Sequence, residues 1–312
     1  MDKLILGTRG SKLALVQTKM VIDKIKEIYP KINLDYKIIK TKGDKIIDVS
    51  LNKINDKGFF VKEIQDALLS NNIDVAVHSL KDLPVSLEES KIAAVLKREN
   101  PQDVLLSINK KLLSDFKSED RIGTTSLRRK TQIRNLNSDV KIIDIRGNVD
   151  TRINKMKDGF CEGLVLAYAG VKRLGLTKYI VQEFKVNELI PAPAQGAIAL
   201  EISKENINLQ NFLRALNHDD TMNSVLAERS FLRKLNGGCH LPFACNAKIT
   251  NDIIKVSGMI SSLDSLDIIC KSVTGKKNEA ENLGVELAQN IIESGGLSII
   301  SKINSNLENV KL

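Results

Sequence analysis

Residues 3–40 read KLILGTRGSKLALVQTKMVIDKIKEIYPKINLDYKIIK. Two short apolar runs, residues 3–7 and 34–40, flank residues 13–28, in which apolar side chains recur at helical spacing. A strand, a helix and a second strand in that order are typical of a parallel sheet with helices on both faces. We therefore expect the chain to begin with a doubly wound α/β domain.

The same alternation continues and then starts again. Residues 61–70 have a helical pattern and residues 73–79 read as a buried strand. After Asn100-Pro101, three further strand and helix pairs follow, at 121–123 with a helix from Leu127, at 141–145 with a helix from Val149, and at 163–167 with 169–174. These segments predict a second α/β unit.

The last third of the chain has a different character. Residues 191–196 predict an extended crossing that two prolines stiffen. Beyond it we expect a helix at 224–235, strands at 243–249, 253–261 and 266–274, and a helix at 279–294. Three successive strands before a helix predict a small α+β domain with an antiparallel sheet.

The composition limits the class of protein. A chain of 312 residues allows two or three domains, and its charged start followed by a short strand is not a signal peptide, so we expect a cytoplasmic protein without membrane spans. Four cysteines without a CxxC pair indicate neither a disulfide framework nor a zinc ribbon. No P-loop or GxGxxG motif follows a strand, so a nucleotide cofactor is unsupported.

The net charge of +9 indicates anionic partners. Nucleic acid is disfavoured, because only 4% of the residues are aromatic and single-strand binding uses aromatic stacking. Residues 121–173 hold twelve Lys and Arg against five Asp and Glu. These cations recur singly at the ends of expected strands and helices, which favours a pocket for small polycarboxylates over a solvated basic face.

Polar segments follow the expected strands. They are residues 8–11, 41–44 and 78–82 in the first unit, and 123–129 and 146–148 in the second. In open α/β sheets, ligands bind at the carboxyl ends of the strands. Residues 123–129 combine hydroxyl side chains, a helix start and two arginines, which is typical of an anion site.

Asp82 is a candidate catalytic residue. It is the lone acid amid cations after a buried strand, so it should stay ionised, stabilise a cationic intermediate and move protons. A structural Asp in the turn before Pro84 is the alternative. We expect His78 to be a hydrogen-bonded core histidine, and three histidines in all give little support to a metal or triad mechanism.

Cys239 lies in LNGGCHLP, residues 235–242, where Asn236 and the glycines are expected to end a helix. A thiol on such a turn can face a cleft and act as a nucleophile or an attachment point. A small buried hydrophobe beside the helix end is the alternative. A metal site formed by Cys239, His240 and Cys245 lacks a good fourth ligand.

Five motifs in this order resemble the hydroxymethylbilane synthase family, also called the porphobilinogen deaminases. They are HSLKDLP at 78–84, IGTTSLRR at 122–129, IRGNVDTR at 145–152, APAQGA at 192–197 and GGC at 237–239. The likeness runs from GTRGS at 7–11 into the third domain. Each motif is modest alone, and five in order are highly specific.

The resemblance implies residue roles. Cys239 matches the cysteine that carries a dipyrromethane cofactor through a thioether, and Asp82 matches the carboxylate that contacts pyrrole N–H groups at the reacting centre. Cofactor-binding positions match Ser79, Lys81, Asp82, Thr125, Ser126, Arg128, Arg129 and Arg146. Substrate-binding positions match Arg9, Ser11, Arg129, Arg146, Arg152, Arg173 and Gln195. A mobile lid in the first domain matches Lys53, Lys57, Gly58 and Phe60.

The resemblance also implies an activity and a fold. Family members are transferases of haem biosynthesis that join four porphobilinogen molecules head to tail on the dipyrromethane primer, lose ammonia and release hydroxymethylbilane by hydrolysis. The implied fold has two α/β domains that resemble periplasmic-binding-protein lobes, residues 1–98 with 195–217 and residues 99–194, and an α+β domain at 218–312. Neither a metal, a nucleotide nor more than a monomer is required.

Alternatives remain beside this resemblance. Asn100-Pro101-Gln102-Asp103 stands where the family more often has Asp-Pro-Arg-Asp, and residues 240–243 also differ in detail from many members. A non-catalytic, two-lobed anion-binding protein is the main alternative, although it has no use for Asp82 and Cys239. A nucleic-acid-binding module is the third.

Overall fold

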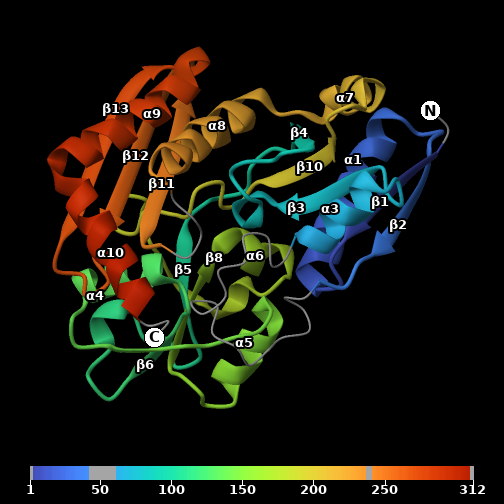
Figure 1. Ribbon diagram of the computed structural model, residues 1–312. Coiled ribbons are helices and arrows are strands. Elements are labelled where there is room, and N and C mark those ends of the chain that lie inside the picture. Colours follow the sequence, from blue (N-terminus) through green and yellow to red (C-terminus); the bar gives the residue numbers. More distant parts are fainter. Residues whose placement is uncertain (1–2, 42–60, 237–240, 310–312) are drawn as a thin grey trace.

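The computed structural model describes residues 3–41, 61–236 and 241–309, without the side chains of residues 306–309. Three units are arranged around a common centre, and each is built on its own sheet (Figure 1). The first two units contain five strands each and the third contains three.

The first unit has the strand order β2-β1-β3-β10-β4. Its strands are β1 (Lys3–Thr8), β2 (Asn33–Ile38), β3 (Val75–Ser79), β4 (Ser90–Val95) and β10 (Ile198–Ser203). Helices α1 (Lys12–Ile28) and α7 (Ile207–Leu213) cover one face, and α3 (Lys62–Leu69) covers the other. Because side chains alternate along a strand, Ser79 of β3 turns toward α1 and His78 turns toward α3.

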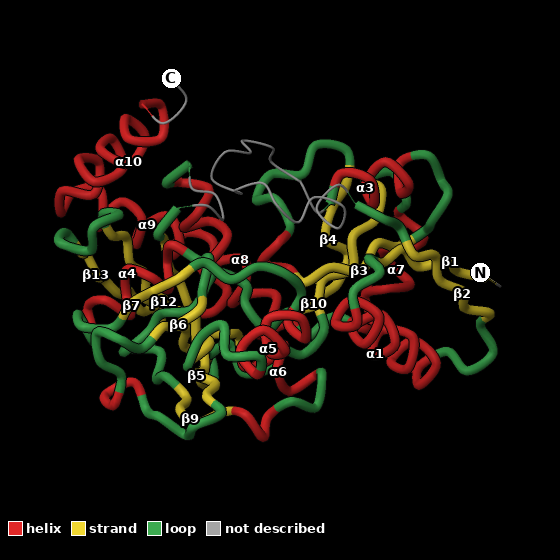
Figure 2. The backbone as a smooth tube through the Cα atoms, turned by 90° about the horizontal axis from the view of Figure 1, so that it is seen from below, coloured by secondary structure: helices red, strands yellow, loops and turns green. Residues whose placement is uncertain are grey.

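The second unit has the strand order β7-β6-β8-β5-β9. Its strands are β5 (Asp103–Ser107), β6 (Arg121–Gly123), β7 (Lys141–Ile143), β8 (Gly163–Ala167) and β9 (Ile180–Glu183). Helices α5 (Val149–Lys157) and α6 (Tyr168–Arg173) cover one face, and α4 (Leu127–Leu136) covers the other. Figure 2 shows α5 and α6 beside α1, so these helices face one another across the two units.

Both sheets are mixed, which corrects the expectation of parallel sheets. Strands β1, β2 and β3 run parallel, as do β6, β7 and β8, but β10 and β5 run antiparallel to both of their neighbours. Each of these two strands enters its sheet directly from the other unit, at the edge where parallel strands end. Asp103 therefore pairs with Ala167, the last residue of β8, and Ile198 pairs with Ser79, the last residue of β3.

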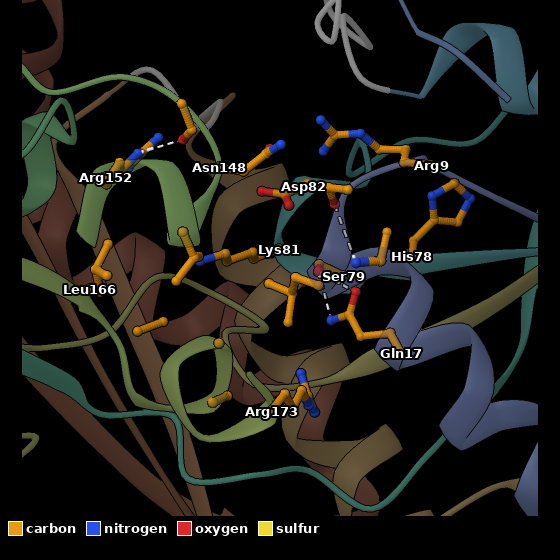
Figure 3. A pocket seen from close by; sticks show the side chains of 18 of the residues that line it. Arg9, Gln17, His78, Ser79, Lys81, Asp82, Asn148, Arg152, Leu166 and Arg173 are labelled. Carbon is orange, nitrogen blue, oxygen red and sulfur yellow. Dashed lines mark hydrogen bonds between the residues drawn. The ribbon is translucent and has the colours of Figure 1, made fainter. Parts of the chain in front are cut away.

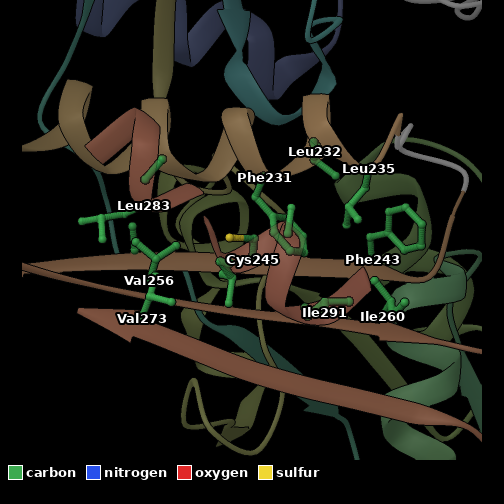
Figure 4. Packing of buried hydrophobic residues seen from close by; sticks show 14 of the residues in the cluster. Phe231, Leu232, Leu235, Phe243, Cys245, Val256, Ile260, Val273, Leu283 and Ile291 are labelled. Carbon is green, nitrogen blue, oxygen red and sulfur yellow. The ribbon is translucent and has the colours of Figure 1, made fainter. Parts of the chain in front are cut away.

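The third unit is an antiparallel sheet of β11 (Phe243–Thr250), β12 (Ile253–Ser261) and β13 (Ile268–Lys276), as expected. Helices α8 (Asp219–Lys234) and α9 (Ala280–Ile291) pack on it, and α10 (Leu297–Asn309) follows. Cys245 lies inside this apolar core (Figure 4), where burial raises the pKa of its thiol well above the usual value. Cys245 is therefore a core residue and unsuited to the metal site considered above.

A buried ion pair joins the three units. Arg98, just before the first crossing, donates to Glu228 of α8, with Nη1–Oε1 at 2.6 Å and Nη2–Oε2 at 3.1 Å. Glu228 also accepts the backbone N–H groups of Ala194, in the second crossing, and Ala247, in β11. All four groups are held at one point, which fixes the α/β units against the third unit.

The two crossings touch at Gly196, which has φ of +89°. A Cβ atom there would lie 2.5 Å from the backbone oxygen of Glu99, so only glycine fits this close approach. In the other crossing, the Asn100 amide donates to Oε1 of Gln102 at 2.8 Å. This crossing is thus held by a hydrogen bond between two neutral side chains.

Candidate active site

A cleft of about 1010 Å³ lies between the first and second units. It is lined from both sides by most of the residues expected from the sequence. The first unit supplies Arg9, Ser11, Ser79, Lys81 and Asp82, and the second unit supplies Thr125, Arg129, Arg146, Arg152 and Arg173. These residues follow or adjoin the carboxyl ends of strands, as the sheet topology requires.

Asp82 ends a short 3-10 helix, Leu80–Asp82, directly after β3. The Leu80 N–H donates to the carbonyl oxygen of Ala197 at 3.0 Å. Beyond Asp82, the guanidinium of Arg229 in α8 donates to the carbonyl oxygens of residues 83, 84 and 85 at 2.6–3.1 Å. The backbone is therefore held on both sides, while the carboxylate is exposed in the cleft between Arg9 and Arg152 (Figure 3).

Lys81 lies beside Asp82 and is half-buried. Burial lowers the pKa of Lys81 to about 8, although the negative charge of Asp82 acts in the opposite direction. Its Nζ lies 3.4 Å from Oε1 of Gln195, a long hydrogen bond. A carboxylate ligand would favour the charged form of this lysine.

Two arginines on the opposite wall are also held in unfavourable surroundings for a cation. Burial and the nearby Arg129 lower the pKa of Arg152 to about 10, and burial lowers the pKa of Arg173. Arg152 donates from Nε to the carbonyl oxygen of Gly147 at 2.7 Å, and Arg173 donates from Nη2 to that of Gly196 at 2.7 Å. Because the cations repel one another, anionic ligands are favoured in this cleft.

Arg128 and Arg129 share one buried carboxylate, that of Asp103 at the start of β5. Nη1 of Arg128 lies 2.7 Å from Oδ2, and Nη2 of Arg129 lies 2.7 Å from Oδ1. Burial alone would raise the pKa of Asp103, but the two guanidinium groups hold it well below the usual value. Of this pair, Arg129 lines the cleft, whereas Arg128 lies behind it and also donates to the carbonyl oxygen of Ile190.

Hydroxyl side chains cap the helices that start at the cleft. Oγ of Ser11 accepts the N–H of Ala14 at the start of α1, and Oγ of Ser126 accepts that of Arg129 at the start of α4. Ser11 lines the cleft, whereas Ser126 is not on its wall. The helix N-termini add partial positive charge to that of the arginines.

The other expected residues are buried or lie outside the described part of the chain. Gln195 is fully buried beneath the cleft, and His78 is buried as expected, with Nε2 2.7 Å from Oε2 of Glu201. Cys239 and the four expected lid residues lie outside the described residues. They are Lys53, Lys57, Gly58 and Phe60.

Sequence reasoning missed several residues of the site. Gln17 of α1 exchanges two hydrogen bonds with Ser79, at 2.8 and 3.0 Å, and lines the cleft with Asn148 and Lys155. A signal existed for Gln17, because it is polar on the buried stripe of a helix. Asp103 also carried one, because it is a charged residue directly before three apolar residues of a buried strand. Arg229 carried no comparable signal.

Family models match nearly the whole chain. Residues 4–211 match "Porphobilinogen deaminase, dipyromethane cofactor binding domain", and residues 222–293 match "Porphobilinogen deaminase, C-terminal domain". The chain belongs to the porphobilinogen deaminase family. The family expected from the five motifs is confirmed.

Full-length relatives agree. A porphobilinogen deaminase of Clostridium novyi is 45% identical over 93% of this chain and 99% of its own length. One from Syntrophomonas wolfei is 44% identical over 96% of this chain and 98% of its own length. Among solved structures, the periplasmic aliphatic sulphonate binding protein SsuA of Escherichia coli is similar with a TM-score of 0.39 and 9% identity, over 76% of this chain and 71% of that one.

The cleft fits the dipyrromethane that the family model names. Cationic side chains on both walls suit its carboxylate groups, and apolar residues between them suit the faces of pyrrole rings. The apolar lining includes Leu13, Val149, Leu166 and Ala169. Within the described ranges, no three His, Cys, Asp or Glu side chains are grouped to hold a metal ion.

None of the described helices is both long and apolar enough to cross a membrane.

Proposed function

We propose that this protein is a porphobilinogen deaminase that joins four porphobilinogen molecules on a covalent dipyrromethane and releases the linear tetrapyrrole by hydrolysis. One observation supports this above the others: among the described residues that line the cleft, the exposed Asp82 is the single acid, and the other charged side chains are cations from two units. A non-catalytic anion-binding protein would gain nothing from an acid there.

Asp82 does the chemistry in this proposal. Porphobilinogen loses ammonia and becomes a cationic azafulvene, and the Asp82 carboxylate stabilises that positive charge. After the new carbon–carbon bond forms, the carboxylate accepts the proton that the ring must lose. Positioned acid–base groups of this kind contribute roughly 10²–10⁴-fold to a rate.

The cations orient the reactants. Arg9 on one wall and Arg129, Arg146, Arg152 and Arg173 on the other would hold acetate and propionate groups, with Lys81 as a further contact. When bound, the dipyrromethane supplies the nucleophilic carbon that starts the chain, and Cys239 would hold it through a thioether. Thr125, Ser79 and Ser11 would complete the polar contacts in the cleft, and Ser126 would contribute through its cap at the start of α4.

The proposal extends to the organisation of the chain. Residues 1–98 with 195–217 would form the first domain, residues 99–194 the second and residues 218–312 the third, with Lys53, Lys57, Gly58 and Phe60 in a lid. We also propose a monomer, because both described walls of the cleft come from the two α/β units of the same chain. Size-exclusion chromatography with light scattering checks that expectation.

Intact-mass spectrometry tests the proposed function. The purified protein should exceed its sequence mass by one covalent dipyrrole and should consume porphobilinogen. Cys239→Ser should lose both properties, whereas Cys270→Ser, at an exposed cysteine in β13, should keep both. A bare wild-type polypeptide that consumes no porphobilinogen under any expression condition would overturn the proposal.

A further inference from the structure

A chain of polar contacts crosses between the two α/β units beneath the cleft. It runs from Asp103 in β5, through Gln195 in the second crossing, to Lys81 beside Asp82. Nε2 of Gln195 donates to Oδ1 of Asp103 at 2.9 Å, and Oε1 of Gln195 accepts from Nζ of Lys81 at 3.4 Å. Asp103 and Gln195 are both 0% exposed, so neither can touch a ligand in the cleft.

Asp103 fixes the orientation of a guanidinium that faces the ligand. Its Oδ1 accepts from Nε and Nη2 of Arg129, at 3.1 and 2.7 Å, and Nη1 of Arg129 donates to the carbonyl oxygen of Val165 at 3.1 Å. Counting partners in the described ranges, three of the five N–H groups are used. The remaining two belong to the two terminal nitrogens, which is the arrangement that binds a carboxylate with both donors.

Gln195 is itself held firmly by both crossings. Its Nε2 also donates to the carbonyl oxygen of Pro101 at 2.7 Å, and its own carbonyl oxygen accepts from Nε of Arg98 at 2.8 Å. The next carbonyl oxygen, that of Gly196, accepts from Arg173. The amide of Gln195 is therefore a fixed point between a cation of the first unit and the carboxylate that holds Arg129 of the second.

We propose that Asp103 and Gln195 are positioning residues that keep the Lys81–Asp82 segment of the first unit in register with the Arg129 guanidinium of the second. The proposal rests on the proposed function and deepens it. It also gives Gln195 a role other than the ligand contact expected from the sequence.

The coupling predicts a change in the titration of Lys81. Among the described residues, the charged groups that act on Lys81 are Asp82 and Asp103, which favour its charged form, and Arg128 and Arg129, which oppose it. Gln195 offers its ammonium an uncharged acceptor. Loss of that acceptor makes the charged form less favourable, so Lys81 should lose its proton at lower pH.

Gln195→Met is the test variant, because methionine has a similar volume and lacks both the donor and the acceptor. Gln132→Met is the matched control. Gln132 is also buried, at 5% exposed, and its amide contacts the backbone of Ile190 and Arg128 but neither Asp103 nor Lys81. A general loss of stability would affect both variants.

Competitive labelling with acetic anhydride, read by mass spectrometry of the Lys81 peptide, follows this titration without turnover. At about pH 6.5, well below the pKa of about 8, Lys81 should label roughly threefold faster in Gln195→Met, as expected when the pKa falls by about half a unit, and at the wild-type rate in Gln132→Met. With porphobilinogen, kcat should fall about tenfold in Gln195→Met and KM should change less, since the register of groups at the reacting centre is lost.

Identical Lys81 labelling in the two variants would overturn the coupling. If the wild-type protein does not consume porphobilinogen but the labelling contrast is present, the proposed function fails and the coupling stands. Equal losses of kcat in the two variants would also contradict the proposal, because they would show only that a buried glutamine had been removed.

Discussion

In the first α/β unit the strand ends present an acid beside a lysine, whereas in the second unit the same edge presents arginines. The strand plans are identical: three parallel strands and one antiparallel strand that arrives from the other unit, followed by an edge strand. The same arrangement of strands therefore presents two different sets of side chains to the cleft. In the proposed function, the first unit supplies Asp82 for chemistry, and the second supplies most of the cations that hold the reactants.

The acids of the two units differ in the same way. Asp103 is fully buried and binds two arginines of its own unit, so its charge is used to keep guanidinium groups inside the protein. Asp82 is exposed in the cleft. A buried carboxylate that is already paired cannot stabilise a new cation, which supports the proposal that Asp82 is the reactive group.

Removal of the exposed acid should have the largest effect. Asp82→Asn should slow porphobilinogen turnover by roughly 10²–10⁴-fold, because the amide neither stabilises the cation nor accepts its proton. The covalent dipyrrole should remain, as checked by intact mass. Asp150→Asn, which changes the partner of the exposed Lys12, is the control and should keep turnover. An unchanged turnover rate in Asp82→Asn would contradict the assignment of the chemistry to Asp82.

Removal of the buried acid should affect stability. Asp103→Asn leaves two buried guanidinium groups without their anion and should lower the free energy of unfolding by about 3–5 kcal/mol. Urea denaturation at neutral pH measures this loss.

The pH dependence gives a second check on Asp103. Its pKa is depressed in the folded state, so its stabilising effect is complete above the ordinary value of about 3.9 and is lost as the pH falls toward the folded value. The difference in free energy of unfolding between wild type and Asp103→Asn should therefore become smaller below about pH 4. If the two proteins have the same free energy of unfolding at neutral pH, the arginines need no buried anion.

A cation of the second unit should affect binding. Arg152→Gln removes a charge-assisted contact worth about 1.5–3 kcal/mol, so KM should rise roughly 10–100-fold while kcat changes little. Arg134→Gln, at an exposed position of α4, is the control. A loss confined to kcat would assign Arg152 to the chemistry.

Lys81 of the first unit should make the affinity for substrate fall at alkaline pH. Because the pKa of Lys81 is lowered to about 8, its charge is lost as the pH rises through that value. Affinity for porphobilinogen should fall roughly fivefold between about pH 8 and 9 if Lys81 binds a carboxylate. In Lys81→Arg the side chain should stay charged, so this fall in affinity should disappear. If affinity falls in the same way with pH in wild type and in Lys81→Arg, Lys81 does not bind a carboxylate of the ligand.

The exposed ion pair between α1 and α5 should matter least. Lys12 of α1 lies 3.1 Å from Asp150 of α5, but the lysine side chain is 75% exposed. Such pairs contribute about 0–1 kcal/mol and are screened by salt. Lys12→Ala should therefore change the free energy of unfolding by less than about 1 kcal/mol. A larger loss would show that this pair holds the units together.

The periodicity of the sequence predicted the elements that pack locally. Residues 13–28 became α1, and the strand ending at Ser79 became β3, because their apolar spacing depends only on which face is buried. The direction of β5 and β10 did not follow from spacing. It depends on where the chain enters each sheet after crossing from the other unit. The helix expected from residue 224 begins at Asp219, where the His218 side chain accepts the Thr221 N–H.

The motifs predicted most of the cleft wall but not the residues that support it. Arg129, Arg152 and Asp82 were expected from their motifs and line the cleft. Asp103 lies 26 residues from Arg129 and 92 from Gln195, and such contacts are set by the packing of the units. The same reasoning explains Arg128, whose motif suggested a ligand contact although its guanidinium faces inward.

Single-turnover kinetics across a range of porphobilinogen concentrations, on Asp82→Asn and Arg152→Gln, tests the division between the units most directly. The account predicts that Asp82→Asn lowers the limiting rate with little change in the half-saturating concentration, and that Arg152→Gln does the reverse. If both variants change the same parameter by similar factors, chemistry and binding are not divided between the two units.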